Sequence, residues 1–217
     1  MPAKKTRTYD STARRARAEE ERRATRRRVV EAARHLFLTN GYPGTTMVDI
    51  ASEAGVALQS VYTAAKSKAD LLQLVVDTVV AGDDEPVLVI ERESFTSIGE
   101  EPDPVRQVEM VAALIAATQE RSAPVQVVFR QAAAVDDAIA ANLDAELQRR
   151  HATFAAIIAM IPEDHLRHPR EESVDLAWAI GSTEVFLLLR QRRGWDADHY
   201  VKALTRVLVD LLLVPPS

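Results

Sequence analysis

The sequence predicts an all-α fold, with a small N-terminal helix-turn-helix domain followed by a larger helical bundle. Apolar residues recur every three or four positions, as at Val29, Val30, Ala33, Leu36 and Phe37, which places them on one face of a helix. Glycine or proline separates such stretches, and no stretch shows the alternation of polar and apolar residues that is typical of a half-buried strand. We therefore expect helices throughout and no sheet.

Composition narrows the class of protein. The chain has 217 residues, enough for a small and a larger domain, and it contains no cysteine. This excludes disulfides, thiolate metal sites and cysteine nucleophiles. Its longest apolar runs, such as residues 185–189, are far too short to cross a bilayer. We therefore expect a cytoplasmic protein with no membrane partner.

Charge is distributed unevenly along the chain. Residues 1–68 carry 14 Lys and Arg against 7 Asp and Glu, whereas residues 69–217 carry 13 against 25. A basic end on an acidic body indicates that one end meets a polyanion such as nucleic acid. A solvated basic tail is the alternative reading of the charge alone.

Residues 1–23 are predicted to form a basic, flexible arm, because they lack a sustained apolar stripe and are rich in arginine. From residue 13 onward they could instead extend the first helix, since Ala, Arg and Glu favour helices. Residues 24–80 are predicted to form the helix-turn-helix domain. Its four helices are expected at residues 24–39, 46–54, 58–64 and 67–80, with Thr45 or Thr46 as the cap of the second.

Residues 81–217 are predicted to form the second domain. After a break at residues 81–86, a weakly defined helix is expected near 91–98. Further helices are expected at 104–121, 124–135, 136–161, 171–192 and 196–214. Pro104 and Pro124 would occupy first turns, where proline is tolerated, and Gly194 and Pro215 would delimit the last helix.

The segment from residue 46 to residue 62 has the pattern of a helix-turn-helix. The motif requires a small residue where its helices cross, a residue that tolerates positive φ in the turn, and an apolar residue that holds the second helix down. Ala51, Gly55 and Val61 stand at these positions. The pattern alone is moderately specific, because αα-hairpins without a DNA function use the same packing.

Residues 24–80 resemble the TetR family of transcriptional regulators. The resemblance rests on Leu36-Phe37-Leu38-Thr39-Asn40-Gly41-Tyr42, on Thr45-Thr46, and on Val61-Tyr62 followed by Lys66-Ser67-Lys68-Ala69-Asp70-Leu71-Leu72. It implies a homodimer that binds double-stranded DNA at an inverted repeat and uses residues 81–217 to bind a small-molecule effector and to dimerise. The expected function is a repressor released by its ligand. The alternatives are a constitutive DNA-binding regulator and a helical adaptor that binds acidic partners.

Two positions depart from the pattern of the family. Ala57 stands where members usually have Ser or Thr as the cap of the recognition helix, and Ala65 stands where they have an aromatic residue. An alanine cap forfeits about 1 kcal/mol relative to serine or threonine. We therefore expect a less firmly ordered recognition helix.

The expected DNA contacts are of two kinds. In a helix-turn-helix the second helix enters the major groove, so base contacts are expected from Leu58, Gln59, Ser60 and Thr63. Gln59 is the main candidate, because a carboxamide can pair bidentately with adenine. Phosphate contacts, which position the protein without reading sequence, are expected from Thr45, Thr46, Tyr62 and Lys68. Lys66 and the basic arm are further candidates, and a solvated helix face is the alternative.

The last two predicted helices, residues 171–192 and 196–214, are the expected dimer interface. Their apolar stripes are wider than one buried face requires, although an ordinary monomer core would also account for them. The interface candidates are Val174, Val185, Leu204, Val207, Leu208 and Leu211.

A ligand cavity is expected among the helices of residues 104–191, for an apolar or amphiphilic effector. The apolar candidates are Met110, Leu114, Phe129, Phe154, Trp178 and Phe186, and the polar candidates are Gln131, His151 and Glu184. Aromatic and Met side chains at helical spacing also occur as plain core.

No pattern in the chain points to an enzyme. The sequence has no glycine-rich phosphate loop and no His-Glu-x-x-His motif. His165 and His168 fall in a predicted loop without an obvious third ligand. We therefore expect no catalytic residue, no cofactor and no metal site.

Overall fold

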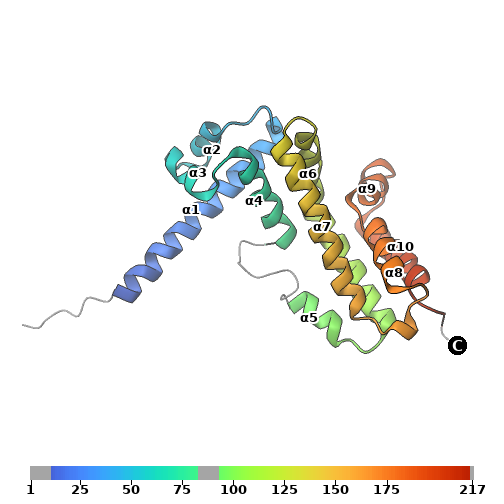
Figure 1. The fold of residues 1–217 in the computed structure, drawn as a ribbon. Helices are drawn as coiled ribbons and strands as arrows, with labels where there is room; N and C mark the ends of the chain where they lie inside the picture. Colours follow the sequence, from blue (N-terminus) through green and yellow to red (C-terminus); the bar gives the residue numbers. More distant parts are fainter. Residues whose placement is uncertain (1–10, 83–92, 216–217) are drawn as a thin grey trace, which may run out of the picture. The chain divides into compact units, whose positions relative to one another are not determined.

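The computed structural model describes residues 11–82 and 93–215, which form helices and no strand (Figure 1). The all-α prediction is confirmed. The chain divides into two compact units, Met1–Leu71 and Leu72–Ser217. None of the described helices combines the length and the apolar character that crossing a bilayer requires.

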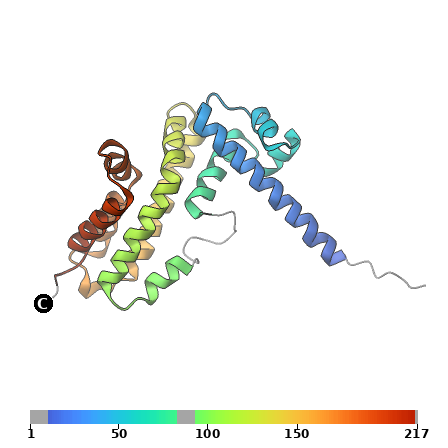
Figure 2. The same cartoon turned by 180° about the vertical axis from the view of Figure 1, so that it is seen from behind.

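The first unit contains α1 (Ser11–Asn40), α2 (Met47–Ala54), α3 (Leu58–Ala64) and the start of α4 (Lys68–Ala81). Figure 2 shows α1 as one continuous helix with α2 and α3 beside it. The buried residues Val29, Ala33 and Phe37 of α1 form the core with Ile50 of α2 and Val61 of α3. The apolar residues that recur at helical spacing therefore form the core of the first unit, as the sequence predicts.

The predicted arm is corrected by the structure, since its residues from Ser11 onward belong to α1. Alanine, arginine and glutamate favour helix formation. Ion pairs at helical spacing add to this, as between Arg17 and Glu21 and between Arg23 and Glu19. Residues 1–10 of the predicted arm lie outside the described residues.

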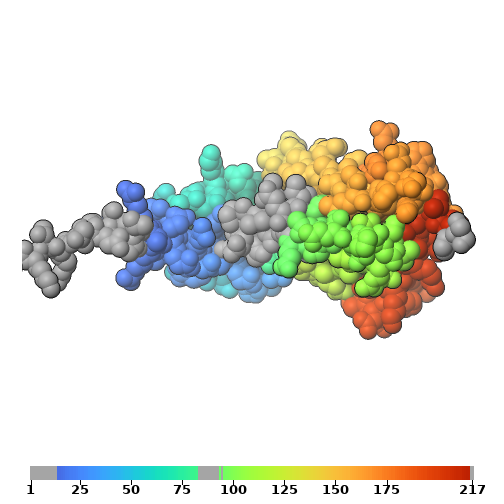
Figure 3. Space-filling model, turned by 90° about the horizontal axis from the view of Figure 1, so that it is seen from below, coloured from blue at the N-terminus to red at the C-terminus, as the bar shows by residue number. Residues whose placement is uncertain are grey.

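The second unit contains the rest of α4, then α5 (Glu93–Glu100), α6 (Pro104–Ala133), α7 (Asp137–Ala159), α8 (Arg170–Ile180), α9 (Thr183–Phe186), a π-helical segment (Leu187–Arg192) and α10 (Ala197–Leu212). Helix α6 packs against α7 and α10, and α8 packs against α7 and α10. Figure 3 shows α5, in green, against the later residues of α7, in orange. The four helices α6, α7, α8 and α10 thus share one core.

Helix α6 corrects the prediction of two helices, 104–121 and 124–135, because it passes through Pro124 without ending. A proline inside a helix removes the hydrogen bond to the carbonyl four residues earlier, which here belongs to Glu120. Both residues are exposed, so water can hydrate that carbonyl. The exposed location limits the cost of the proline, and buried residues on the opposite face hold the helix together.

The predicted helix 171–192 is also corrected, because it breaks at Gly181. A Cβ at this position would stand 2.8 Å from the ring of Phe154, closer than real Cβ contacts allow. The buried Gln119 of α6 holds the break: its amide donates to the Gly181 carbonyl (2.9 Å) and accepts from the Thr183 hydroxyl (3.0 Å). Buried hydrogen bonds from the core therefore stabilise the break between α8 and α9.

Arginine side chains satisfy the carbonyl groups that helix ends leave without a partner. Arg121 donates to the end of α4, Arg170 to the end of α7, Arg150 to the last turn of α8, and Arg167 to the Leu213 carbonyl after α10. These charged donors add to the backbone hydrogen bonds that end these helices, such as that from the Gly82 amide to the Thr78 carbonyl after α4.

Candidate nucleic-acid interface

Helix α2 begins with a capping box. Thr46 accepts a hydrogen bond from the Asp49 amide (3.1 Å), and the Asp49 carboxylate accepts from the Thr46 amide (3.0 Å) and hydroxyl (2.7 Å). The Thr46 hydrogen bonds lower the pKa of Asp49. The sequence predicts Thr45 or Thr46 as the cap of α2, and the structure shows that Thr46 is the N-cap residue.

The turn between α2 and α3 is a Schellman motif centred on Gly55. Its φ of 62° and ψ of 42° lie in the left-handed region that glycine adopts without strain. The Gly55 amide donates to the Ser52 carbonyl and the Val56 amide to the Ala51 carbonyl (3.0 Å). This turn sets the direction in which α3 leaves α2.

Helix α3 buries one residue and presents the others. Val61 is fully buried against α1 and α2, whereas Leu58 is 38% and Tyr62 45% exposed. Gln59 and Thr63 are exposed, and Ser60 is half-buried. The Thr63 hydroxyl donates to the Gln59 carbonyl (2.8 Å). The methyl group of Thr63 is therefore the part of this side chain that remains for a contact outside the helix. The predicted recognition residues therefore share the open side of one short helix.

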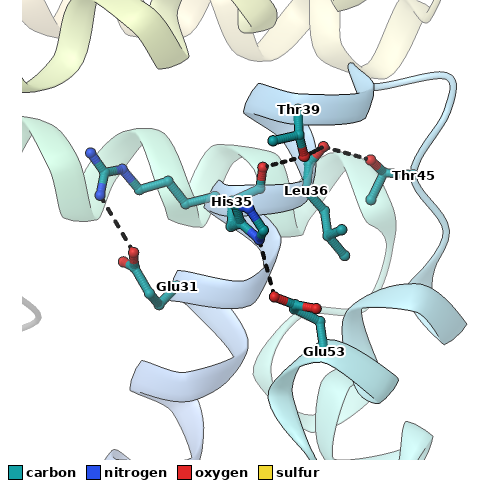
Figure 4. Close-up of polar contacts among 7 residues, drawn as sticks. Glu31, His35, Leu36, Thr39, Thr45 and Glu53 are labelled. Carbon is teal, nitrogen blue, oxygen red and sulfur yellow. Dashed lines mark hydrogen bonds and ion pairs between the residues drawn. The ribbon is translucent and has the colours of Figure 1, made fainter.

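Thr45 does not face solvent, so its predicted phosphate contact through the side chain is wrong. The residue is fully buried. Its hydroxyl is shared between the carbonyls of Leu36 (3.1 Å) and Gly41 (2.9 Å), and Figure 4 shows it reaching back to α1. Thr45 ties the loop before α2 to the end of α1, while its neighbour Thr46 stays exposed.

Lys68 has a structural role that its sequence pattern does not show. Its ammonium donates to the carbonyls of Tyr42 (2.8 Å) and Thr45 (3.0 Å) and lies 4.1 Å from the centre of the Tyr42 ring. An ammonium group has three N–H donors, so one remains for a phosphate. Lys68 therefore holds the loop between α1 and α2, and its phosphate contact stays a prediction. Lys66, the weaker candidate, is exposed.

A side-chain hydrogen bond that sequence reasoning missed joins α1 to α2. His35 Nδ1 lies 3.0 Å from a Glu53 carboxylate oxygen, and the Thr39 hydroxyl donates to the His35 carbonyl (Figure 4). The two partners are eighteen residues apart and belong to no motif, so only the packing of the helices could reveal them.

Residues 29–75 match the model of bacterial regulatory proteins of the tetR family. This chain carries a tetR-family domain. The curated relatives TtgR and ArpR, both from Pseudomonas putida, are each 38% identical to it over 63 residues. That match spans 29% of this chain and 30% of each relative.

Solved structures extend the likeness of the fold beyond the tetR-family domain. NalD from Pseudomonas aeruginosa, the secondary repressor of the MexAB-OprM multidrug efflux pump, has a TM-score of 0.66 at 20% identity, over 89% of this chain and 98% of its own. A protein from Saccharomonospora viridis, crystallised with choline, has a TM-score of 0.65 at 18% identity, over 88% and 98%. Both likenesses concern the fold.

Helix α3 of the tetR-family domain starts without a side-chain cap, as its sequence predicts. Ala57 has the extended conformation of a cap residue, with φ of −65° and ψ of 144°, but no side chain that could accept a hydrogen bond. Ala65, at the other end of the helix, is buried, so a small residue fills the position that the family usually gives to an aromatic ring.

Ala57→Ser should therefore stabilise the tetR-family domain. A serine hydroxyl at this position can accept from the free amides of the first turn, which is worth about 1 kcal/mol. Thr46→Ala removes an existing cap and should cost a similar amount, which makes it the matched control. Urea unfolding monitored by circular dichroism measures both. A loss of stability in Ala57→Ser would contradict the assignment of residue 57 as the cap.

The second unit corrects part of the predicted dimer interface. Val174, Leu204 and Leu208 are buried within the protomer itself, because the apolar stripes of α8 and α10 face α6 and α7. Val185 and Leu211 are half-buried, and Val207 is 42% exposed. Leu188, which the sequence did not single out, is 59% exposed. The apolar surface of α8 and α10 that remains available to a second protomer is therefore narrower than the sequence predicts.

The predicted ligand residues occupy three kinds of position. Phe129, Phe154 and Phe186 are buried, and Met110, Leu114 and Trp178 are partly buried. Gln131 is exposed. His151 pairs with Asp175 (2.8 Å) and meets the edge of Trp178, while Glu184 pairs with Arg130. Whether these residues contact a ligand stays a prediction.

The two histidines of residues 165–168 do not come together with other metal ligands in the structure. His168 precedes α8, and its Nδ1 lies 3.3 Å from a carboxylate oxygen of Glu172 in the first turn of that helix. Within residues 11–82 and 93–215, no three His, Cys, Asp or Glu side chains are grouped so that they could hold a metal ion.

Proposed function

We propose that this chain is a cytoplasmic, homodimeric transcriptional regulator, a repressor that leaves an inverted-repeat operator when a small molecule binds its second unit. The observation that carries the proposal is the geometry of α3 within a tetR-family domain, where Val61 is buried and Gln59 and Thr63 face outward. The description of TtgR as a transcriptional regulator and of NalD as a repressor supports it.

The exposed side of α3 suits the major groove. Gln59 has a free carboxamide that can donate to and accept from the edge of adenine, and Leu58 or the methyl group of Thr63 can touch a thymine methyl. Tyr62 presents its hydroxyl where a phosphate contact would position the helix. The exposed arginines of α1 can add phosphate contacts, although several of them pair with glutamates of the same helix.

Selection from a pool of random DNA duplexes tests the proposal. A two-fold dimer places its recognition helices in successive major grooves about 34–36 Å apart, so the selected sequences should form an inverted repeat with that spacing. An adaptor for acidic partners would retain duplexes without any preference of sequence. Selection that yields no shared sequence would therefore remove the regulator from consideration.

Gln59→Ala should cost about 1–3 kcal/mol on the selected site and relax the preference at one base position in each half-site. It should leave the affinity for scrambled duplex almost unchanged, because the amide carries no charge. Gln148→Ala, at an exposed position of α7, is the matched control and should change neither affinity. Fluorescence anisotropy on both duplexes measures these values. Equal losses on operator and scrambled duplex would overturn the assigned role of Gln59.

Regulation follows from linkage between the two sites. If a ligand weakens operator binding by some factor, the operator must weaken ligand binding by the same factor. The choline bound to the Saccharomonospora viridis protein supports a ligand site within this fold, although that protein shares only 18% identity with this chain. A constitutive regulator would bind the same operator but show no such coupling with any ligand.

A further inference from the structure

The meeting point of α6, α7, α8 and α10 contains a cation that no carboxylate neutralises. Among the described residues, Arg150 has no carboxylate partner within ion-pair distance. One of its five N–H groups donates to the Trp178 carbonyl. Its guanidinium lies 5.0 Å from the ring centre of Phe154 and 5.3 Å from that of Trp178. A charge partly buried among aromatic rings is costly unless it is paired.

A second arginine, Arg130, lies close enough to Arg150 to act on its charge. Burial, together with the nearby charge of Arg130, lowers the pKa of Arg150 to about 10, so Arg150 stays charged at neutral pH. Glu146 partly offsets the charge of Arg150, but its carboxylate is held by Arg149 at 2.6 Å. Glu184 pairs with a terminal nitrogen of Arg130, so Arg150 is the arginine of the two that lacks an ion-pair partner among the described residues.

Three buried polar atoms near these arginines lack a hydrogen-bond partner. They are Trp178 Nε1, Arg130 Nε and the Tyr200 hydroxyl. The two nitrogens can only donate. Tyr200 is 1% exposed, and burial raises its pKa to about 12, so its hydroxyl keeps its proton and can donate too. The group that is missing from this cluster is therefore an acceptor.

We propose that Arg150, Tyr200 and Trp178 form the binding site for an oxyanion, and that the effector of this protein carries a carboxylate on an apolar body. The carboxylate supplies the countercharge for Arg150 and the acceptor for the Tyr200 hydroxyl and the indole N–H. The rings of Phe154 and Phe186 contact the apolar body; Phe186 meets Tyr200 edge to face at 5.2 Å. This inference rests on the proposed function, because it names the chemical class of the effector.

Tryptophan fluorescence gives a direct test. The chain has two tryptophans, and Trp195→Phe leaves Trp178, which lies beside Arg150, as the sole emitter. Titrating this variant with octanoate and benzoate, and with the amides and amines of the same carbon skeletons, separates charge from shape. Each carboxylate should bind with a Kd below about 1 mM, and the amides and amines at least about tenfold more weakly.

Variants in the same background locate the charge that binds. Arg150→Met keeps the length of the side chain and should weaken carboxylate binding at least about tenfold without changing amide binding. Tyr200→Phe removes only the hydroxyl and should weaken it by about threefold or more. Arg106→Met, at an exposed position of α6 outside the proposed site, is the matched control and should leave both affinities unchanged.

Arg150 also donates to the end of α8, so circular dichroism must confirm that Arg150→Met is folded. If that variant does not fold, Tyr200→Phe decides the question, because its hydroxyl has no partner to lose. The proposal is overturned if no carboxylate binds below about 1 mM, if amides bind as tightly as carboxylates, or if the preference survives both substitutions. A chain that binds carboxylates but no specific duplex would refute the proposed function and leave this site standing.

Discussion

Leu208→Glu is expected to unfold the second unit, whereas Val207→Glu, on the adjacent residue, is expected to leave it folded. Leu208 is fully buried where α10 packs against α6 and α8. The substitution loses the packing of a leucine, about 2–5 kcal/mol, and places an unpaired carboxylate in the core, which costs several more. Domains are stable by about 5–15 kcal/mol, so the loss approaches or exceeds the whole stability.

Val207→Glu tests the dimer instead of the core. Val207 is 42% exposed in the protomer, so a carboxylate there can remain in water unless a partner covers it. If α10 forms the dimer interface, two carboxylates meet across the two-fold axis and separate the protomers. Light scattering should then change from twice 24.0 kDa to 24.0 kDa, with circular dichroism unchanged.

The two substitutions also define what would contradict the prediction. A folded Leu208→Glu with an unchanged melting temperature would mean that residue 208 is not in the core. A dimeric Val207→Glu would mean that the interface lies elsewhere on the second unit. Val105→Glu, at a similarly exposed position of α6, serves as the control for the added charge.

Lys68→Met is expected to weaken binding to all DNA sequences by about tenfold or more. The substitution leaves the Tyr42 and Thr45 carbonyls without their shared donor, at a cost of about 1–3 kcal/mol for each group that stays buried. The loop between α1 and α2 then loses the contact that positions the start of α2, and a phosphate contact from the third N–H would be lost with it.

Salt dependence separates the two roles of Lys68. If its ammonium also contacts a phosphate, the slope of log affinity against log salt should fall by about one unit per protomer. If Lys68 only holds the loop, affinity should fall while the slope stays the same. Lys202→Met, at an exposed position of α10 in the second unit, is the control for loss of charge. Unchanged affinity in Lys68→Met would show that neither role matters for binding.

The sequence by itself determined the helix-turn-helix, because its signals are local. The cap at Thr46, the left-handed turn at Gly55 and the buried side chain of Val61 act within one or two turns of helix. The predicted bounds of α3 were therefore correct, and those of α2 and α4 agree to within a residue. The same local rules identified Ala57 as an empty cap.

Only the tertiary structure decided how residues with the same local pattern differ. Thr45 and Thr46 are adjacent and chemically identical, yet one is buried against α1 and the other caps α2. Helical spacing placed Leu208 on an apolar face but could not say whether its own protomer or a partner covers it. The continuation of α6 through Pro124 and the isolation of Arg150 from carboxylates likewise depend on residues far away in the chain. Periodicity reports which side of a helix is buried, whereas packing determines what that side contacts.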